Sequence, residues 1–353
     1  MNSKLRQALA SGGIENSPII DEELDISALP SKDLITQLTS MIRIRQAEVK
    51  IAEMRKDGHI GGPVHLGAGQ EAIAVGISSH LRKSDRIFSA HRSHSHLLAL
   101  GTDVRKLFAE LLGKSTGLTH GMGGSMHLWD QPNGFYGSVP IVAGTVPLAV
   151  GAGLAAKMQR SGDVAVAYFG DGAAEEGVVQ ESLNLASQLG IPILFVCENN
   201  FFSSHMHISQ RQPIHSMARF AEANNIDSEV VDGNNVVSVS EAAARLISLS
   251  RAKNVPGFLE VVTFRHYGHV DWREDIDVGV NRSASEVEKW KSRDPINRLK
   301  RTILEKKILT ESEIESVYLN INSEIEAAWK LAVSDPYPTE SELLRTVYKE
   351  VRK

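Results

Sequence analysis

The stretch from 164 to 200 most constrains how this chain can fold. An apolar run (VAVAYF) leads into a Gly-Asp-Gly turn at 170–172, and a helix-length segment then leads into a second apolar run (IPILFVCE) that ends in two asparagines. Two short apolar runs separated by one helix are typical of a parallel β-α-β unit. The helix is predicted to end near Leu189, because Gly190 follows it.

The same alternation of apolar runs and helix-like stretches continues from about 60 to 270, and PGFLEVVTF at 256–264 is a further strand candidate. We therefore expect an α/β fold in which a parallel sheet is flanked by helices. The expected regions are an irregular N-terminal arm (1–30), an α/β domain (31–282) and a C-terminal helical extension (283–353).

Two helix boundaries stand out in the sequence. Apolar residues at three- and four-residue spacing predict a long amphipathic helix that starts near Ser31, its expected N-cap, and stops at Gly58. Thr310 followed by Glu313 predicts a capping box at the start of a charged helix in the C-terminal region.

Composition excludes several classes of protein. With 353 residues, 42% hydrophobic and 23% charged side chains and a formal net charge of -5, the chain carries no basic stripe for nucleic acid. We expect neither secretion nor membrane insertion, because the first 30 residues show no sustained apolar core with a cleavage pattern and no later apolar run reaches about 18 residues. Its single cysteine, Cys197, lies in an apolar run and is expected to be buried in a cytoplasmic protein.

Asp171 and Asn200 are the first candidates for a binding site. Each follows a predicted strand, and ligands of open α/β sheets bind where the carboxyl ends of the strands meet. A carboxylate and an amide oxygen suit Mg²⁺ together with a phosphate group. Gly-Asp-Gly alone is also an ordinary turn, so the spacing to the two asparagines carries the prediction.

The pattern resembles the thiamine-diphosphate signature, and flanking segments narrow the family. These are the GGSMH motif at 123–127, FYGSVPIVAGTVPLAVGAGLA at 135–155, and the Arg-His-Tyr-Gly-His motif at 265–269. In order and spacing they resemble the alpha subunits of pyruvate, branched-chain 2-oxo acid and acetoin dehydrogenases. The resemblance covers about residues 35 to 340.

The resemblance implies a set of site residues. The Mg²⁺ ligands would be Asp171, the side chain of Asn200 and the backbone carbonyl of Phe202. The cofactor-binding residues would be Arg92, Val142, Gly170, Asp171, Gly172, Ala173, Asn200 and Arg265. His65 and His269 would face the reaction centre and take part in proton transfer. Outside this context the arginines could lie on the surface, and the histidines could be satisfied core residues.

The resemblance also implies partners. The chain has one Gly-Asp-Gly unit and no room for a second domain that would bind the pyrimidine ring of the cofactor. We therefore expect an E1 beta subunit in an α₂β₂ assembly, with transfer of the acyl group from a 2-oxo acid to the lipoyl arm of an E2 acyltransferase. The alternatives are cleavage of a hydroxyketone, as in acetoin dehydrogenase, and a non-catalytic scaffold.

Several positions depart from the family. The run 201–207 (FFSSHMH) replaces sequences such as Arg-Tyr-Gly, His91 stands where Tyr is frequent, and Pro140 stands where Gly is common. Val270 replaces a serine that mitochondrial pyruvate enzymes phosphorylate, and 270–277 is expected to form a loop over the active-site mouth. A zinc site remains an alternative for one further set of histidines: His91, His94, His96, His205 and His207.

Overall fold

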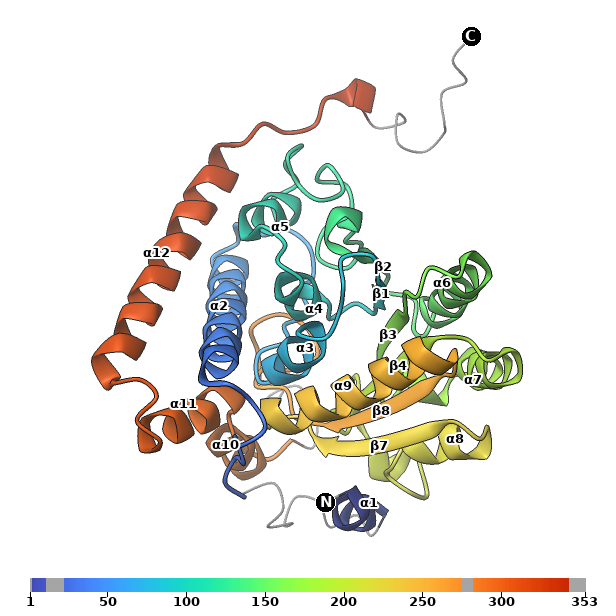
Figure 1. The fold of residues 1–353 in the computed structure, drawn as a ribbon. Coiled ribbons are helices and arrows are strands. Elements are labelled where there is room, and N and C mark those ends of the chain that lie inside the picture. The colour runs from blue at the N-terminus through green and yellow to red at the C-terminus, as the bar shows by residue number, and fades with distance from the viewer. Residues whose placement is uncertain (1, 11–21, 275–281, 343–353) are drawn as a thin grey trace.

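The computed structural model describes residues 2–10, 22–274 and 282–342. Its centre is a six-stranded sheet in the order β2-β1-β3-β4-β8-β7, and all neighbouring strands in it are parallel. The strands are β1 (Arg86–Ser89), β2 (Phe135–Ser138), β3 (Ala165–Gly170), β4 (Ile193–Asn199), β7 (Asp227–Asp232) and β8 (Gly257–Val262). The expected α/β fold with a helix-flanked parallel sheet is confirmed (Figure 1).

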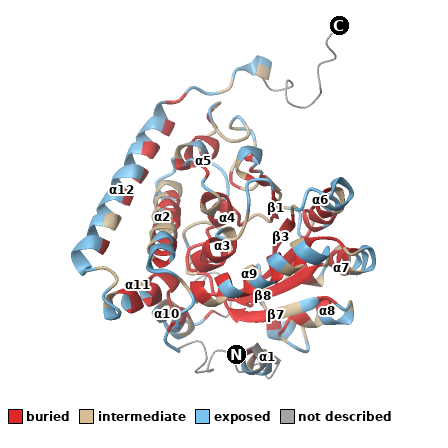
Figure 2. Ribbon diagram, in the orientation of Figure 1, coloured by how far each residue is buried: buried red, intermediate tan, exposed pale blue. Residues whose placement is uncertain are grey.

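The central strands are buried on both faces, which explains why they read as unbroken apolar runs. Val166 and Val196 point into one hydrophobic cluster, while Ala167 and Phe195 point into a second. Cys197 is fully buried in the second cluster, so its predicted burial is confirmed. This burial raises the pKa of its thiol. Figure 2 shows these strands as the buried centre of the molecule.

Helices cover both faces of the sheet. The first cluster receives side chains from α2 (Ser31–Lys56), α3 (Glu71–Ser78), α4 (His94–Ala99), α5 (Val104–Leu111), α9 (Val236–Lys253), α11 (Pro295–Glu305) and α12 (Glu311–Ser334). The second cluster receives them from α1 (Asn2–Ala10), α6 (Val146–Gln159), α7 (Gly177–Leu189), α8 (Ala218–Ala223) and α10 (Ala284–Ser292). Short elements complete the fold: η3 (Gln131–Asn133), η4 (Ala173–Glu175), η5 (Ile208–Gln210), η6 (Glu340–Glu342), and an antiparallel pair, β5 (Phe202–Ser203) with β6 (Met206–His207).

The N-terminal arm is not irregular throughout, so that prediction is wrong for residues 2–10, which form α1. Leu5 and Leu9, one helical turn apart, are buried in the second cluster. Arg6 forms an ion pair with Glu222 and donates to the backbone carbonyl of Ser228. The apolar spacing of the two leucines is the signal for this helix.

The long helix is confirmed as α2, with one correction at its start. Ser31 is the first helical residue, and Pro30, with φ −60° and ψ 146°, holds the N-cap position without a side-chain cap. Proline suits this place because its fixed φ favours entry into a helix. Gly58 follows the helix with φ +81°, as expected for a stop signal.

The described part of the C-terminal region contains the helices α10, α11 and α12. Of these, α11 and α12 pack against helices of the α/β region. α12 lies along α2 and α5, and α11 also contacts α2 (Figure 1). The predicted capping box of Thr310 and Glu313 is present at the start of α12. The boundaries between the three expected regions stay predictions, and α11 and α12 share one core with α2.

No described helix combines the length and the apolar character needed to cross a bilayer.

Candidate active site

The ends of β3, β4 and β8 lie level at one edge of the sheet. In the strand register Gly170 pairs with Glu198, and Asn199 pairs with Val262. Residues that follow these strands therefore converge on a cavity of about 230 Å³. All the predicted site residues line it: His65, Arg92, Val142, Gly170, Asp171, Gly172, Ala173, Asn200, Phe202, Arg265 and His269.

Asp171 is held at one oxygen and left open at the other. Its side chain is almost fully buried, and its Oδ2 pairs with the guanidinium of Arg211, which also pairs with Glu175. Its Oδ1 is buried and makes no hydrogen bond within the described residues. A buried carboxylate oxygen without a donor is costly in free energy, so this atom fits a missing cation.

Asn200 and Phe202 line the same cavity as Asp171. The Asn200 side-chain oxygen accepts from the backbone N–H of Phe202 at 3.3 Å, and its amide donates to Gln70 at 3.5 Å. A Cβ added at Gly172 would lie 2.3 Å from the Ser203 hydroxyl oxygen, so only glycine allows this approach. Carboxylate and amide oxygens together fit a hard cation such as Mg²⁺.

Two buried arginines supply positive charge. Arg92 donates to the carbonyls of Leu66 at 2.6 Å and His269 at 3.3 Å. Arg265 donates to the carbonyl of Ser204 at 3.2 Å. Both side chains are buried, at 8% and 2% exposure, so the alternative that they lie on the surface is wrong. Two guanidinium groups beside an oxygen-lined cation site suit the oxygens of a diphosphate.

Three histidines meet across the cavity. The ring centroids of His65 and His269 lie 5.1 Å apart, and His91 lies 4.5 Å from His65 and 5.5 Å from His269. Burial, and next the Arg92 charge, lower the pKa of His65 to about 3 and that of His91 and of His269 to about 2. All three imidazoles are therefore neutral near pH 7.

Comparison with known proteins identifies the architecture. Residues 39–341 match the model of the family described as dehydrogenase E1 component. The chain belongs to this family. It is 36% identical over 327 residues to the alpha subunit of acetoin:2,6-dichlorophenolindophenol oxidoreductase from Bacillus subtilis, a match that covers 92% of this chain and 96% of that protein.

Pyruvate dehydrogenase subunits are similar to this chain over comparable lengths. The E1 alpha subunit from Rickettsia felis is 32% identical over 320 residues, covering 90% of this chain and 97% of that protein. The mitochondrial E1 alpha subunit from Dictyostelium discoideum is 34% identical over 330 residues, covering 94% and 86%. The resemblance to E1 alpha subunits is therefore confirmed, while the role of each site residue stays a prediction.

His94 of this E1 chain serves the framework around the cavity. His94 lies between Glu48, at 3.3 Å, and Ser125, at 2.9 Å. Glu48 also accepts from the backbone N–H of Gly67 at 3.1 Å. One buried carboxylate on α2 thus ties together the segments that carry His65, Arg92 and the GGSMH motif.

The zinc set considered from sequence is not brought together. His96 contacts Ser89 at 2.8 Å and Glu198 at 3.1 Å and stacks on Tyr168. His207 lies by Ser209 at the start of η5. Within the described part of the chain, one member of this set, His91, belongs to a group of possible metal ligands. The other members of that group are His65 and His269.

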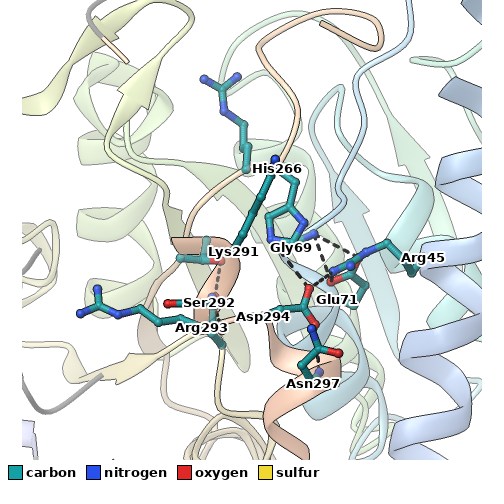
Figure 3. Close-up of polar contacts among 12 residues, drawn as sticks. Arg45, Gly69, Glu71, His266, Lys291, Ser292, Arg293, Asp294 and Asn297 are labelled. Carbon is teal, nitrogen blue, oxygen red and sulfur yellow. Dashed lines mark hydrogen bonds and ion pairs between the residues drawn. The ribbon is translucent and has the colours of Figure 1, made fainter. Parts of the chain in front are cut away.

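A second buried network lies beside His266 in the Arg265–His269 segment of the E1 chain (Figure 3). Arg45 on α2 forms ion pairs with Glu71, at 2.5 Å, and with Asp294, at 2.8 Å. Glu71 accepts from the N–H of Gly69 at 3.1 Å, and His266 lies 3.8 Å from Asp294. The network therefore links the start of α11 to α2 and to the loop that carries Gly69.

Sequence reasoning missed Arg211 and left His91 without a role. Arg211 follows β6 and reaches Asp171 only because the β5–β6 hairpin folds back over the cavity. No motif spacing marks it. The sequence signal that could have placed His91 in the site is its position directly before Arg92, a predicted cofactor-binding residue. The expected loop 270–277 is described only to residue 274, and within that part Asp271 pairs with Arg55 at 2.9 Å.

Proposed function

We propose that this chain is the alpha subunit of a thiamine-diphosphate-dependent 2-oxo acid dehydrogenase. With a beta subunit it would decarboxylate a 2-oxo acid and pass the acyl group to the lipoyl group of an E2 component. The observation that carries this proposal is the convergence of an open Asp171 oxygen, two buried arginines and neutral histidines in one cavity of an E1-family chain.

The residues present fit the cofactor. Asp171 Oδ1, the Asn200 side chain and the Phe202 carbonyl would hold Mg²⁺, while Arg92 and Arg265 would bind the diphosphate. Backbone of Val142, Gly170, Gly172 and Ala173 would complete the cofactor pocket. When bound, thiamine diphosphate supplies the carbon nucleophile and the electron sink for cleavage beside the carbonyl.

His65 and His269 would act on the substrate side. The Arg265 guanidinium lies 3.4 Å from Nδ1 of His269 and donates to it, which holds that imidazole in its neutral form. A neutral imidazole can donate or accept a hydrogen bond and so orient a reacting hydroxyl group. We assign this role during acyl transfer to His269, with His65 opposite it.

A beta partner is supported by the surface around the cavity mouth. Val142, which lines the cavity, is 49% exposed, and its neighbour Ile141 is 70% exposed. Exposed apolar side chains at a binding site favour a covering partner. We propose an E1 beta subunit for this place, in an α₂β₂ assembly, and a cytoplasmic location stays a prediction.

A second candidate is cleavage of a hydroxyketone. It is favoured by the similarity to the Bacillus subtilis protein, whose name specifies acetoin as its substrate. The two reactions differ in one product, because a 2-oxo acid releases CO₂ and acetoin does not. Labelled CO₂ release with a panel of 2-oxo acids, measured beside aldehyde release from acetoin, separates them.

The test of the proposed function starts from the chain purified from its own host with Mg²⁺ and thiamine diphosphate. A native mass spectrum should contain a second chain and the mass of the cofactor. The isolated alpha chain should have no decarboxylase activity, and adding the partner should restore it. A cofactor-free homo-oligomer that stays inactive with the partner would support the non-catalytic scaffold instead.

A further inference from the structure

The three histidines of the cavity form a group that the proposed reaction does not fully use. His65, His91 and His269 each present one ring nitrogen, and these nitrogens all lie within 4.8 Å of one another. They come from three separate places: the loop after α2, the segment after β1 and the segment after β8. Across residues 2–10, 22–274 and 282–342, no other trio of His, Cys, Asp or Glu brings its donor atoms this close.

The spacing is close to that of a metal-bound set. Two imidazole nitrogens bound at about 2.05 Å in a tetrahedral shell lie about 3.3 Å apart. The largest separation here is 4.8 Å, so modest side-chain rotations would bring the three nitrogens into one coordination shell. The rings meet edge to face, at interplanar angles of 71°, 75° and 67°.

His65 gives an independent sign of a missing ligand. Only 7% of the surface of His65 is exposed. Its Nδ1 has no hydrogen-bond partner within the part of the chain that the structure describes. A buried ring nitrogen left without a partner is unfavourable, and a bound ion would satisfy it. A bound metal would replace the hydrogen bond that Arg265 donates to His269, because a neutral imidazole has one ring-nitrogen lone pair.

The charges around the cavity do not by themselves favour a second cation, so the nitrogen donors must carry the site. Arg92 and Arg265 line the cavity, Glu198 opposes them, and Asp171 is already paired with Arg211. Donor chemistry then separates two metal sites. Oxygen donors at Asp171 and Asn200 favour a hard ion, and imidazole nitrogens favour borderline transition metals.

We propose that His65, His91 and His269 form a second metal site in the cavity, one that takes a divalent transition metal ion of the Zn²⁺ class. The site depends on His91, which replaces the tyrosine frequent at this place in the family. A bound ion would occupy the lone pairs of both histidines that we place at the reaction centre, and it would therefore inhibit turnover reversibly. The inhibitory part of this inference rests on the proposed function, whereas metal binding itself does not.

Calorimetric titration of Zn²⁺ into the full chain, with Mg²⁺ in large excess to fill the oxygen site, tests binding directly. The expected result is one Zn²⁺ per chain. His91→Phe should weaken this binding at least tenfold, because it removes one of three ligands, and His59→Phe, at an exposed position, should leave it unchanged. Absence of stoichiometric binding, or a loss below tenfold in His91→Phe, overturns the proposal.

Two further measurements keep the outcome clear. Circular dichroism checks that each variant folds, and His65→Gln, which removes a different ligand, should weaken Zn²⁺ binding to a similar extent. Co²⁺ should give the intense visible absorption of a low-coordinate nitrogen site in the wild type and not in His91→Phe. Because these measurements need neither cofactor nor substrate, an inactive enzyme that binds Zn²⁺ rejects only the proposed function, and an active enzyme that does not bind it rejects only the metal site.

Discussion

The most demanding prediction concerns Arg45, the cation between two buried carboxylates. Glu71 is fully buried and Asp294 nearly so, and each forms an ion pair with the Arg45 guanidinium (Figure 3). Burial opposes the charged form of Arg45, but its two carboxylate partners raise the pKa overall. Replacing this residue leaves two acids close together in the core without a positive partner.

The size of the effect follows from that geometry. Removing one partner of a buried ion pair costs about 3–5 kcal/mol of unfolding free energy, because the remaining charge stays buried. For a chain of this size we expect Arg45→Met to lower Tm by roughly 6–10 °C, at about 2 °C per kcal/mol. Arg43→Met is the matched control on the same helix. Its partner Glu324 is 44% exposed, so its loss should cost about 1 kcal/mol or less.

The dependence on pH gives the sharper test. Burial raises the pKa of Glu71 even though Arg45 opposes that rise, so Arg45→Met should raise it further. A carboxyl group whose pKa is higher in the folded state favours folding at low pH, and this contribution is lost as pH rises through the folded pKa. The loss of stability in Arg45→Met should therefore be smaller near pH 5 than near pH 8.

Urea unfolding followed by circular dichroism at both pH values measures this difference. Equal losses in Arg45→Met and Arg43→Met, or a loss independent of pH in Arg45→Met, would refute the reasoning.

Three further predictions concern the loops around the cavity. Asp171→Asn removes the charge of the open oxygen, so calorimetry should give at least tenfold weaker Mg²⁺-dependent binding of thiamine diphosphate; unchanged affinity would reject this ligand. Gly69→Ala places a Cβ 2.6 Å from the His266 ring at φ +97° and should cost about 1–3 kcal/mol in urea unfolding. Gly61→Ala, which meets open space, is its control, and equal stability of the two variants would contradict the strain. Glu110 accepts four backbone N–H groups of residues 119–124, so Glu110→Gln should speed hydrogen exchange there, and unchanged protection would reject its role.

The sequence predicts well those features that depend on neighbouring residues. β3 and β4 were recognisable because strands buried on both faces form unbroken apolar runs, and Gly190 ends α7 with φ +57° as a helix-stopping glycine does. Asp171 and Asn200 could be paired because the carboxyl ends of parallel strands share one edge. These inferences need only local pattern and one general rule of topology.

Features that depend on distant residues were not predictable in the same way. Arg211 lies 40 positions from its partner Asp171, and nothing in its immediate sequence indicates the hairpin that turns it inward. The trio of His65, His91 and His269 needs three segments to arrive at one place, which spacing along the chain cannot give. The expected irregular arm failed at α1 because two leucines in a short polar segment are a weak signal until a surface exists to bury them.

The structure supports each cavity segment with a buried charge from outside the sheet. Glu48 holds the segments of His65 and Ser125, Arg45 links α2 to the loop of Gly69 through Glu71 and to the start of α11 through Asp294, and Arg211 holds Asp171. A buried charge without its partner is costly, so each link has one strongly favoured arrangement. The side chains of His65, His91 and His269 take no part in these three links. Replacing one of these histidines, or binding an ion to them, should therefore leave the fold intact. Substitutions at His91 should therefore change metal and substrate preference more than stability, and those at Arg45 should do the reverse.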